Sequence, residues 1–231
     1  TNIESAVKNN ILGTYSILKA IKGKKIKLIF ISTDKAFNPK TVLGITKKIG
    51  EILVQYMFLK SDYSKSNFAI VRFGNVIGSD GSALPYFVNQ IISNKTISLS
   101  HRKMERYFMS ISEACSLVLQ SSLMTLKNKI LFFDMGKPIK IYKIIKKIFQ
   151  IYKKPNQKLK IKVIGNIYNE KISEQLSYKS RIKKTNLEKV YSTKDKVNNK
   201  FKIEKFINDL EKKIENNEKK KLRKLLFNFI R

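Results

Sequence analysis

Four consecutive polar residues, Ser32-Thr33-Asp34-Lys35, form the group in this sequence best suited to acid–base chemistry. They directly follow the apolar run 27–31, which has the length of a short strand. Ligands of α/β sheets gather where strands end, because polar loops meet at that edge. Twelve residues beyond Lys35 comes Lys47, on a predicted helix that places it one turn after Leu43. A carboxylate and two amines near a strand end could exchange protons with a substrate. A solvated loop pair is the plain alternative for Asp34 and Lys35.

The elements that must position these residues alternate between helix and strand. Apolar spacing predicts helices at about 3–21, 41–58, 85–93, 112–124 and 141–152. Short apolar runs predict strands at 27–31, 68–73, 130–134 and 159–164, the first two buried on both faces. This order predicts an α/β sheet with right-handed crossovers.

The last segment, residues 194–231, is predicted to be a basic amphipathic helix. Its apolar stripe comprises Phe201, Ile203, Phe206, Ile207, Leu210 and Ile214. Docking of this stripe onto the protein is one interpretation, and a helix lying on a membrane surface is the other.

The formal charge of +31 results from 48 Lys and Arg against 17 Asp and Glu among 231 residues. Such a charge invites a nucleic-acid interpretation, since cations neutralise phosphates. Only six of the basic residues are Arg, the side chain best suited to reading base edges, and no nucleic-acid-binding motif is present. We therefore expect no nucleic-acid partner and attribute the Lys excess to general composition.

Other residue types exclude several kinds of site. The single cysteine, Cys115, and the single histidine, His101, cannot build a disulfide framework or a Cys- or His-rich metal site, and we expect no metal.

No apolar run approaches the roughly 18–20 residues that span a bilayer. A reducing cytoplasm is the expected compartment. The chain starts at Thr1 without a signal peptide, and we expect it to be the carboxyl-terminal part of a longer protein.

Several stretches together resemble the CapD-type polysaccharide-biosynthesis proteins, which are extended short-chain dehydrogenase/reductase relatives. This resemblance implies that the α/β sheet is Rossmann-like. The resemblance covers roughly residues 1–192. The stretches that carry it are Asn10–Thr14, Ser32–Lys47, Val71–Ser79, Gly81–Pro85, Arg106–Met109, Asp134–Pro138 and Glu170-Lys171.

The resemblance implies a nucleotide-sugar dehydratase or epimerase of surface-polysaccharide biosynthesis. More specifically it implies a 4,6-dehydratase acting on UDP-N-acetylglucosamine, with NAD or NADP taking hydride from C4 and returning it to C6. Thr33 would then hydrogen-bond the C4 region, Asp34 would act as acid toward the leaving hydroxyl, and Lys35 would remove the C5 proton. Lys47 would bind the nicotinamide ribose.

The same resemblance implies contacts from the second half of the chain. Gly74, Asn75 and Val76 would lie against the nicotinamide and the phosphates, with Asn75 donating to phosphate. Arg106 would clamp the UDP diphosphate through its guanidinium, and Glu170 would contact the substrate. A surface ion pair is the plain alternative for Arg106.

The sequence departs from the family at three positions and lacks one motif. Leu43 stands where related enzymes have a proton-relaying Tyr, Asp80 stands where Arg is usual, and Ile167 begins a segment that has lost the family's Arg. No Gly-x-Gly-x-x-Gly occurs among the nine glycines, so we expect a preceding segment to bind most of the cofactor.

These features predict three parts: residues 1–78 as the later part of an NAD(P)-binding domain, 79–192 as an interleaved substrate lobe with the last sheet elements, and 193–231 as the basic tail. We expect a UDP-sugar substrate, a homo-oligomer, and a parent protein in the cytoplasm or on the cytoplasmic face of the inner membrane. A noncatalytic remnant or split subunit that binds a nucleotide sugar or a partner chain is the alternative, and a basic nucleic-acid binder is the third.

Overall fold

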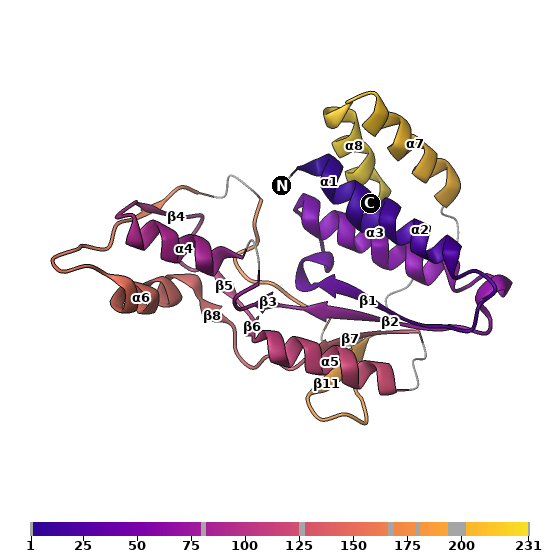
Figure 1. Ribbon diagram of the computed structural model, residues 1–231, viewed down its shortest axis with the longest axis horizontal. Helices are drawn as coiled ribbons and strands as arrows, with labels where there is room; N and C mark the ends of the chain where they lie inside the picture. Colours follow the sequence, from indigo (N-terminus) through magenta and orange to yellow (C-terminus); the bar gives the residue numbers. More distant parts are fainter. Residues whose placement is uncertain are drawn as a thin grey trace. The chain divides into compact units, whose positions relative to one another are not determined.

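The computed structural model divides the chain into two compact units, which are described separately (Figure 1). It describes residues 2–79, 82–124, 128–165, 169–178, 181–193 and 202–230. Unit 1 comprises Thr1–Arg72, Val118–Phe133 and Gln175–Arg231, and unit 2 comprises Phe73–Leu117 and Asp134–Glu174. Helix α5 (Ile111–Leu123) begins in unit 2 and ends in unit 1.

Unit 1 is built on a five-stranded sheet with the order β1-β2-β7-β11-β10. Its strands are β1 (Lys27–Thr33), β2 (Asn67–Phe73), β7 (Lys129–Phe133), β11 (Val190–Thr193) and β10 (Lys183–Lys184). Strands β2 and β7 are parallel, whereas β11 is antiparallel to β7 and β10 is antiparallel to β11. The expected α/β class and the strands near 68–73 and 130–134 are confirmed.

Strands β1 and β2, both predicted to be buried on two faces, differ in how much of each is buried. Strand β2 lies between β1 and β7, and six of its seven residues are buried. Strand β1 stands at the end of the strand order, and Ile31 remains 42% exposed. The prediction that the first strand is buried on both faces is therefore wrong, because β1 has a neighbour on only one side among the described strands.

Helices α1 (Ile3–Val7), α2 (Gly13–Ala20) and α3 (Val42–Met57) lie on one face of this sheet (Figure 1). The predicted helix over 3–21 is present, but a single π-helical turn, Lys8–Leu12, separates α1 from α2. Helix α3 begins at Thr41, whose side chain accepts a hydrogen bond from the Gly44 amide at 3.2 Å and so caps the helix. Short 3₁₀ turns follow β1 and α3, at Asp34–Ala36 and Ser61–Tyr63.

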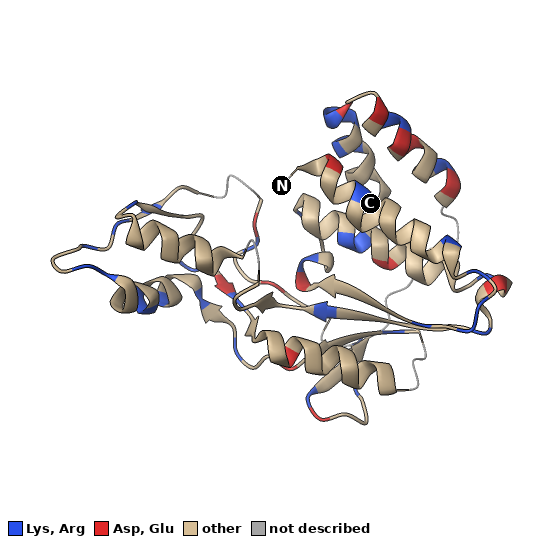
Figure 2. Cartoon of the chain, viewed as in Figure 1, with Lys and Arg blue, Asp and Glu red and all other residues tan. Residues whose placement is uncertain are grey.

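The carboxyl-terminal segment forms two helices, not the single helix predicted. Helix α7 (Ile203–Glu215) and helix α8 (Lys219–Phe229) are joined by a turn in which Asn217 adopts a left-handed conformation. Their apolar residues enter the core that also contains Val7 and Leu53, which confirms the docked interpretation. Charged residues alternate with the apolar ones, namely Lys, Asp and Glu along α7 and Lys and Arg along α8 (Figure 2). Residues 194–201 of the predicted helix lie outside the described residues.

The described residues of unit 2 form three two-stranded pairings, two complete helices and the first part of α5 around a small core. Strand β3 (Asn75–Val76) pairs parallel with β6 (Phe108–Met109), and β5 (Glu105–Arg106) pairs antiparallel with β8 (Ile139–Lys140). Strand β4 (Ile97–Leu99) pairs parallel with β9 (Ile161–Val163). Helices α4 (Ala83–Ile92) and α6 (Ile141–Tyr152) contribute most of the core residues: Phe87, Ile91, Ile141, Ile145 and Phe149.

The strand predicted at 159–164 therefore belongs to β9 in unit 2 and does not extend the sheet of unit 1. That sheet is completed instead by β11 and β10, which the sequence did not predict. Within the described part of the chain, every helix is too short or too polar to traverse a lipid bilayer.

Candidate functional site

The polar turn after β1 holds Thr33, Asp34 and Lys35 close together. Asp34 is completely buried, and Lys35 is 24% exposed. The Thr33 hydroxyl donates a hydrogen bond to Asp34 Oδ1 at 2.9 Å, and Lys35 Nζ donates to the same oxygen at 2.9 Å. The Lys35 amide in turn donates to Thr33 Oγ1 at 3.4 Å. The three predicted side chains thus converge on one carboxylate oxygen.

The second oxygen of the Asp34 carboxylate, Oδ2, differs from Oδ1 in its hydrogen bonding. Asp34 Oδ2 is buried and has no hydrogen-bond partner among the described residues. Leaving a buried polar atom unpaired costs free energy, and such atoms in native structures usually signal a missing partner.

Helix α3 packs directly on the turn because a glycine occupies its first turn. A Cβ atom at Gly44 would overlap the carbonyl oxygen of Lys35 and would lie 3.1 Å from the carbonyl carbon and 3.2 Å from Pro39 Cβ. No other residue fits this position without moving the helix or the turn. Farther along α3, Thr46 Oγ1 accepts a hydrogen bond from Asn10 Nδ2 at 3.1 Å, which ties α3 to the π turn.

Lys47 points from α3 to the end of β1. Its Nζ donates to the Ile31 carbonyl oxygen at 3.2 Å and lies 5.5 Å from the centre of the Phe30 ring. Burial disfavours the charged amine and lowers the pKa of Lys47 below its ordinary value of 10.5. Leu43, one turn earlier on α3, is 38% exposed and carries no group able to relay a proton.

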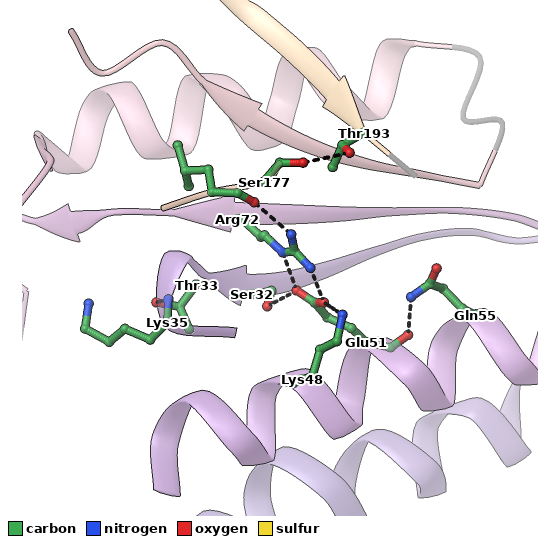
Figure 3. A network of polar contacts seen from close by, with 10 residues as sticks. Ser32, Thr33, Lys35, Lys48, Glu51, Gln55, Arg72, Ser177 and Thr193 are labelled. Carbon is green, nitrogen blue, oxygen red and sulfur yellow. Dashed lines mark hydrogen bonds and ion pairs between the residues drawn. The ribbon is translucent and has the colours of Figure 1, made fainter. Parts of the chain in front are cut away.

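Beside the turn, between β2 and α3, lies a buried ion cluster that was not predicted from the sequence (Figure 3). Arg72 Nε and Nη2 donate to the two carboxylate oxygens of Glu51 at 2.8 and 2.6 Å, and neither side chain is exposed. The Ser32 hydroxyl donates to Glu51 Oε1 at 2.7 Å, and Lys48 Nζ lies 3.4 Å from Oε2. Arg72 Nη1 donates to the Leu176 carbonyl oxygen at 2.8 Å. Lys35 points away from the Glu51 carboxylate in Figure 3.

Burial of the Glu51 carboxylate disfavours its charge and would by itself raise its pKa. The charge and hydrogen bonds of Arg72, with the charge of Lys48 and the Ser32 hydrogen bond, outweigh burial and hold the pKa of Glu51 below its ordinary value. A sequence signal did exist, since Arg72 is the one charged residue in the otherwise apolar run 68–73. A buried guanidinium requires a partner, and this requirement points to a nearby carboxylate.

In unit 2, the predicted residues Gly74, Asn75 and Val76 lie beside β6. The Asn75 amide donates to the Tyr107 carbonyl oxygen at 2.8 Å. A Cβ atom at Gly74 would come 2.8 Å from Met135 Sδ and 2.9 Å from that same carbonyl oxygen. Close packing therefore accounts for glycine at position 74.

Arg106 and Glu170 occupy the same region of unit 2. Arg106 is only 5% exposed, and its Nη1 donates to the carbonyl oxygens of Glu105 and Ile172 at 2.7 and 3.1 Å. Glu170 Oε2 accepts a hydrogen bond from Ser100 Oγ at 2.9 Å. Arg106 is not in the surface ion pair that was the plain alternative, because backbone carbonyls hold its guanidinium inside the unit.

The predicted residues thus form two sets. Thr33, Asp34, Lys35 and Lys47 lie together in unit 1, whereas Gly74, Asn75, Val76, Arg106 and Glu170 lie in unit 2. The dehydratase resemblance implies that Asp34, Lys35, Lys47, Asn75 and Arg106 converge on one pocket at the strand ends, and this stays a prediction. Asp80 and Ile167 lie outside the described residues. Among the residues that the structure describes, no group of three or more His, Cys, Asp or Glu side chains could hold a metal ion.

Comparison with protein families provides the identification. The model of a family described as polysaccharide biosynthesis protein matches residues 1–195. This chain belongs to that family. The polysaccharide biosynthesis family assignment confirms the resemblance inferred from the sequence motifs, and the matched residues include all of unit 2 and unit 1 as far as residue 195.

Two relatives with curated names are similar to this family member. The capsular polysaccharide biosynthesis protein CapD of Staphylococcus aureus is 40% identical over 226 residues, which cover 97% of this chain and 37% of CapD. The UDP-glucose 4-epimerase of Rickettsia bellii is 34% identical over 173 residues, which cover 74% of this chain and 49% of the epimerase. The chain thus spans half or less of the length of these relatives.

Solved structures confirm the expected Rossmann-like fold. The X-ray structure of Pen from Bacillus thuringiensis has a TM-score of 0.72 and 26% identity, and the match covers 85% of this chain and 60% of that chain. DesIV, a dTDP-glucose 4,6-dehydratase from Streptomyces venezuelae with NAD and DAU bound, has a TM-score of 0.64 and 10% identity. That match covers 77% of this chain and 62% of DesIV.

Proposed function

We propose that the protein carrying this chain is an NAD(P)-dependent nucleotide-sugar 4,6-dehydratase that acts on UDP-N-acetylglucosamine in surface polysaccharide biosynthesis. The family match and the 40% identity to CapD support the polysaccharide context. The observation that carries the proposal is the Asp34–Lys35 pair at the end of β1, with its 2.9 Å contact and its unpartnered buried oxygen.

Loss of water from a 4-keto sugar needs a base that removes the C5 proton and an acid that protonates the departing C6 hydroxyl. Moving one proton from Lys35 Nζ to the Asp34 carboxylate converts their ion pair into a neutral amine and a carboxylic acid. The amine then takes the C5 proton, and the acid gives its proton to the leaving hydroxyl. These two transfers restore the original ion pair. When hydride returns to C6, Lys35 gives the proton back to C5, and the proton that the C4 hydroxyl loses on oxidation replaces it, so the whole cycle balances.

The adjacent Thr33 hydroxyl helps to define which oxygen of Asp34 reacts. Thr33 and Lys35 both contact Oδ1, which leaves Oδ2 as the oxygen for a sugar hydroxyl. Because Leu43 cannot relay a proton, the C4 hydroxyl depends on the Thr33–Asp34 hydrogen bond, on Lys35 or on water.

NAD or NADP, when bound, would accept hydride from C4 and return it to C6. The Lys47 amine fits the ribose of such a cofactor, because its contact with the Ile31 carbonyl uses one donor of an ammonium group that has three. DesIV, which has the same fold, was solved with NAD bound. The nine glycines include no Gly-x-Gly-x-x-Gly, so we propose that residues beyond this chain hold the cofactor's pyrophosphate.

The unit 2 residues would bind the nucleotide part of the substrate. We assign Arg106 and Asn75 to the UDP phosphates, Glu170 to a substrate hydroxyl, and the close-packed Gly74–Val76 backbone to the cofactor and phosphates. Arg106 is suited to this task because buried carbonyl contacts fix its guanidinium.

The test is to incubate the full-length gene product that contains this chain with UDP-N-acetylglucosamine and NAD, and to analyse the nucleotide sugars by mass spectrometry and by proton NMR, which detects inversion at C4. The proposal predicts a 4-keto-6-deoxy product that has lost one water. A product of unchanged mass with an inverted C4 would instead indicate an epimerase, like the Rickettsia bellii relative, and would overturn the dehydratase assignment. Absence of any product with cofactor bound would favour a noncatalytic binding protein.

A further inference from the structure

We infer that the buried Glu51–Arg72 ion cluster is a positioning device that sets the catalytic turn relative to Lys47. The inference rests on the proposed function, because the turn matters only if Asp34 and Lys35 carry the proton steps. Neither Glu51 nor Arg72 is assigned to touch substrate or cofactor, so their action is through their neighbours.

The cluster connects the elements that flank the turn. Ser32, which donates to Glu51, immediately precedes Thr33, and Glu51 lies one helical turn after Lys47 on α3. The carboxylate therefore joins β1 to α3 next to the proposed acid and base. On its other side, Arg72 binds β2 to the same carboxylate and to the backbone at Leu176. Arg72 is the last residue of unit 1 before the chain enters unit 2, and Leu176 follows the return of the chain.

The contacts to both oxygens of Glu51 fix the orientation of its carboxylate. Oε1 accepts from Arg72 Nε and Ser32 Oγ, and Oε2 accepts from Arg72 Nη2 and faces Lys48 Nζ. Four donors from three elements thus surround one carboxylate, and the paired contacts from Arg72 are directional as well as strong. A sliding of α3 along β1 would break several of these contacts at once.

Stability alone does not explain such a cluster. Apolar residues of similar size can often replace a buried ion pair without loss of stability, because desolvation of the charges offsets most of their attraction. Apolar side chains fill the same volume but impose no fixed direction on the strands and helix that carry them. This difference separates a positioning role from a purely structural one.

The test compares three variants with the unmodified full-length gene product. The double variant Glu51→Leu/Arg72→Met replaces the pair by apolar side chains, and Arg72→Lys keeps the charge but lacks the two-pronged contact. The matched control Tyr63→Phe removes a different buried hydrogen bond of unit 1, from the Tyr63 hydroxyl to the Leu18 carbonyl oxygen at 2.8 Å. Thermal unfolding, amide hydrogen exchange at Lys35 and Phe37, kcat and KM are measured for each protein.

We expect the double variant to unfold at or above the unmodified midpoint, whereas exchange at Lys35 and Phe37 accelerates about tenfold. The kcat should fall about 100-fold with little change in KM, because misplacement of reacting groups by about 1 Å has an effect of this size. Tyr63→Phe should change neither exchange at the turn nor kcat. If the double variant does not fold, Arg72→Lys should give the same exchange and kcat changes.

Unmodified exchange and kcat in a folded double variant, or in Arg72→Lys, would overturn the inference. Equal losses of kcat in Tyr63→Phe would also overturn it, since they would indicate a general response to lost stability. If the unmodified protein forms no dehydrated product, the proposed function fails, and the exchange measurement at the turn still tests the positioning role independently.

Discussion

Replacement of Gly44 by alanine tests whether the first turn of α3 sets the position of the Asp34–Lys35 turn. The added methyl group would overlap the Lys35 carbonyl oxygen and would lie 3.1 Å from its carbonyl carbon. Unstrained carbon contacts are about 3.5–4.0 Å, so the helix and the turn must separate by roughly 1 Å. The colliding atom belongs to the backbone, and a side-chain rotation therefore cannot relieve the overlap.

The expected magnitude follows from this displacement. Overpacking of this kind costs about 1–3 kcal/mol, which lowers the thermal midpoint but leaves most of the protein folded. A shift of about 1 Å in the reacting groups lowers kcat by about 100-fold. The assay is conversion of UDP-N-acetylglucosamine by the full-length gene product, measured beside calorimetric unfolding of the same preparation.

Gly13→Ala is the matched control. Gly13 also lies in the first turn of a helix of unit 1, but a Cβ atom there would meet only the Lys8 carbonyl oxygen, at an ordinary 3.4 Å. This substitution should stabilise the protein by about 0.5–1 kcal/mol and leave kcat unchanged. A Gly44→Ala protein with unmodified kcat and unfolding midpoint would refute the reasoning, because it would mean that the helix does not constrain the turn.

Three further predictions concern stability and titration. Glu51→Gln leaves the Arg72 charge buried without its partner and should lower the free energy of unfolding by about 3–5 kcal/mol at neutral pH, measured by urea denaturation. The folded-state pKa of Glu51 lies below its ordinary value of 4.5. The stability that the Glu51 carboxylate contributes is therefore present above pH 4.5 and is lost as the pH falls through the folded pKa. The free energy of unfolding of Glu51→Gln should not show this decrease over the same pH range. Leu210→Ala, in the buried face of α7, should cost about 2–5 kcal/mol, whereas Leu123→Ala at an 84% exposed position should change stability by about 0.5 kcal/mol or less. The lowered pKa of Lys47 predicts that its modification by an amine reagent, followed by peptide mass spectrometry, begins at lower pH than modification of exposed lysines, and coincident pH profiles would contradict it.

Much of the fold could be predicted because local patterns and tertiary structure agree. The apolar run before Ser32, the spacing in the helix that carries Lys47 and the apolar strand around Ile70 each indicate the element that forms. The polar turn Thr33-Asp34-Lys35 at the end of β1 was also predicted, because a polar group at a strand end is visible in a single sequence, and its catalytic role stays a prediction. Their resemblance to one family then led to the family assignment that the comparisons confirm.

The rest depends on contacts between residues far apart in the sequence. The exposure of β1 follows from its place at the end of the strand order, and no local pattern records that order. The division of the tail into α7 and α8 depends on the left-handed turn at Asn217, whose neighbours retain helical spacing. The partnership of Glu51 with Arg72 joins positions 21 residues apart, so sequence could indicate that Arg72 needs a partner but not which residue supplies it.

The most direct test of the account is the dependence of product formation on Lys35. The full-length gene product and its Lys35→Ala variant are incubated with UDP-N-acetylglucosamine and NAD, and the 4-keto-6-deoxy product is followed by mass spectrometry, with far-ultraviolet circular dichroism as the check on folding. The account predicts product from the unmodified protein and none from the folded variant. Equal product from both proteins would contradict the assignment of Lys35 as the base and, with it, the central role of the turn after β1.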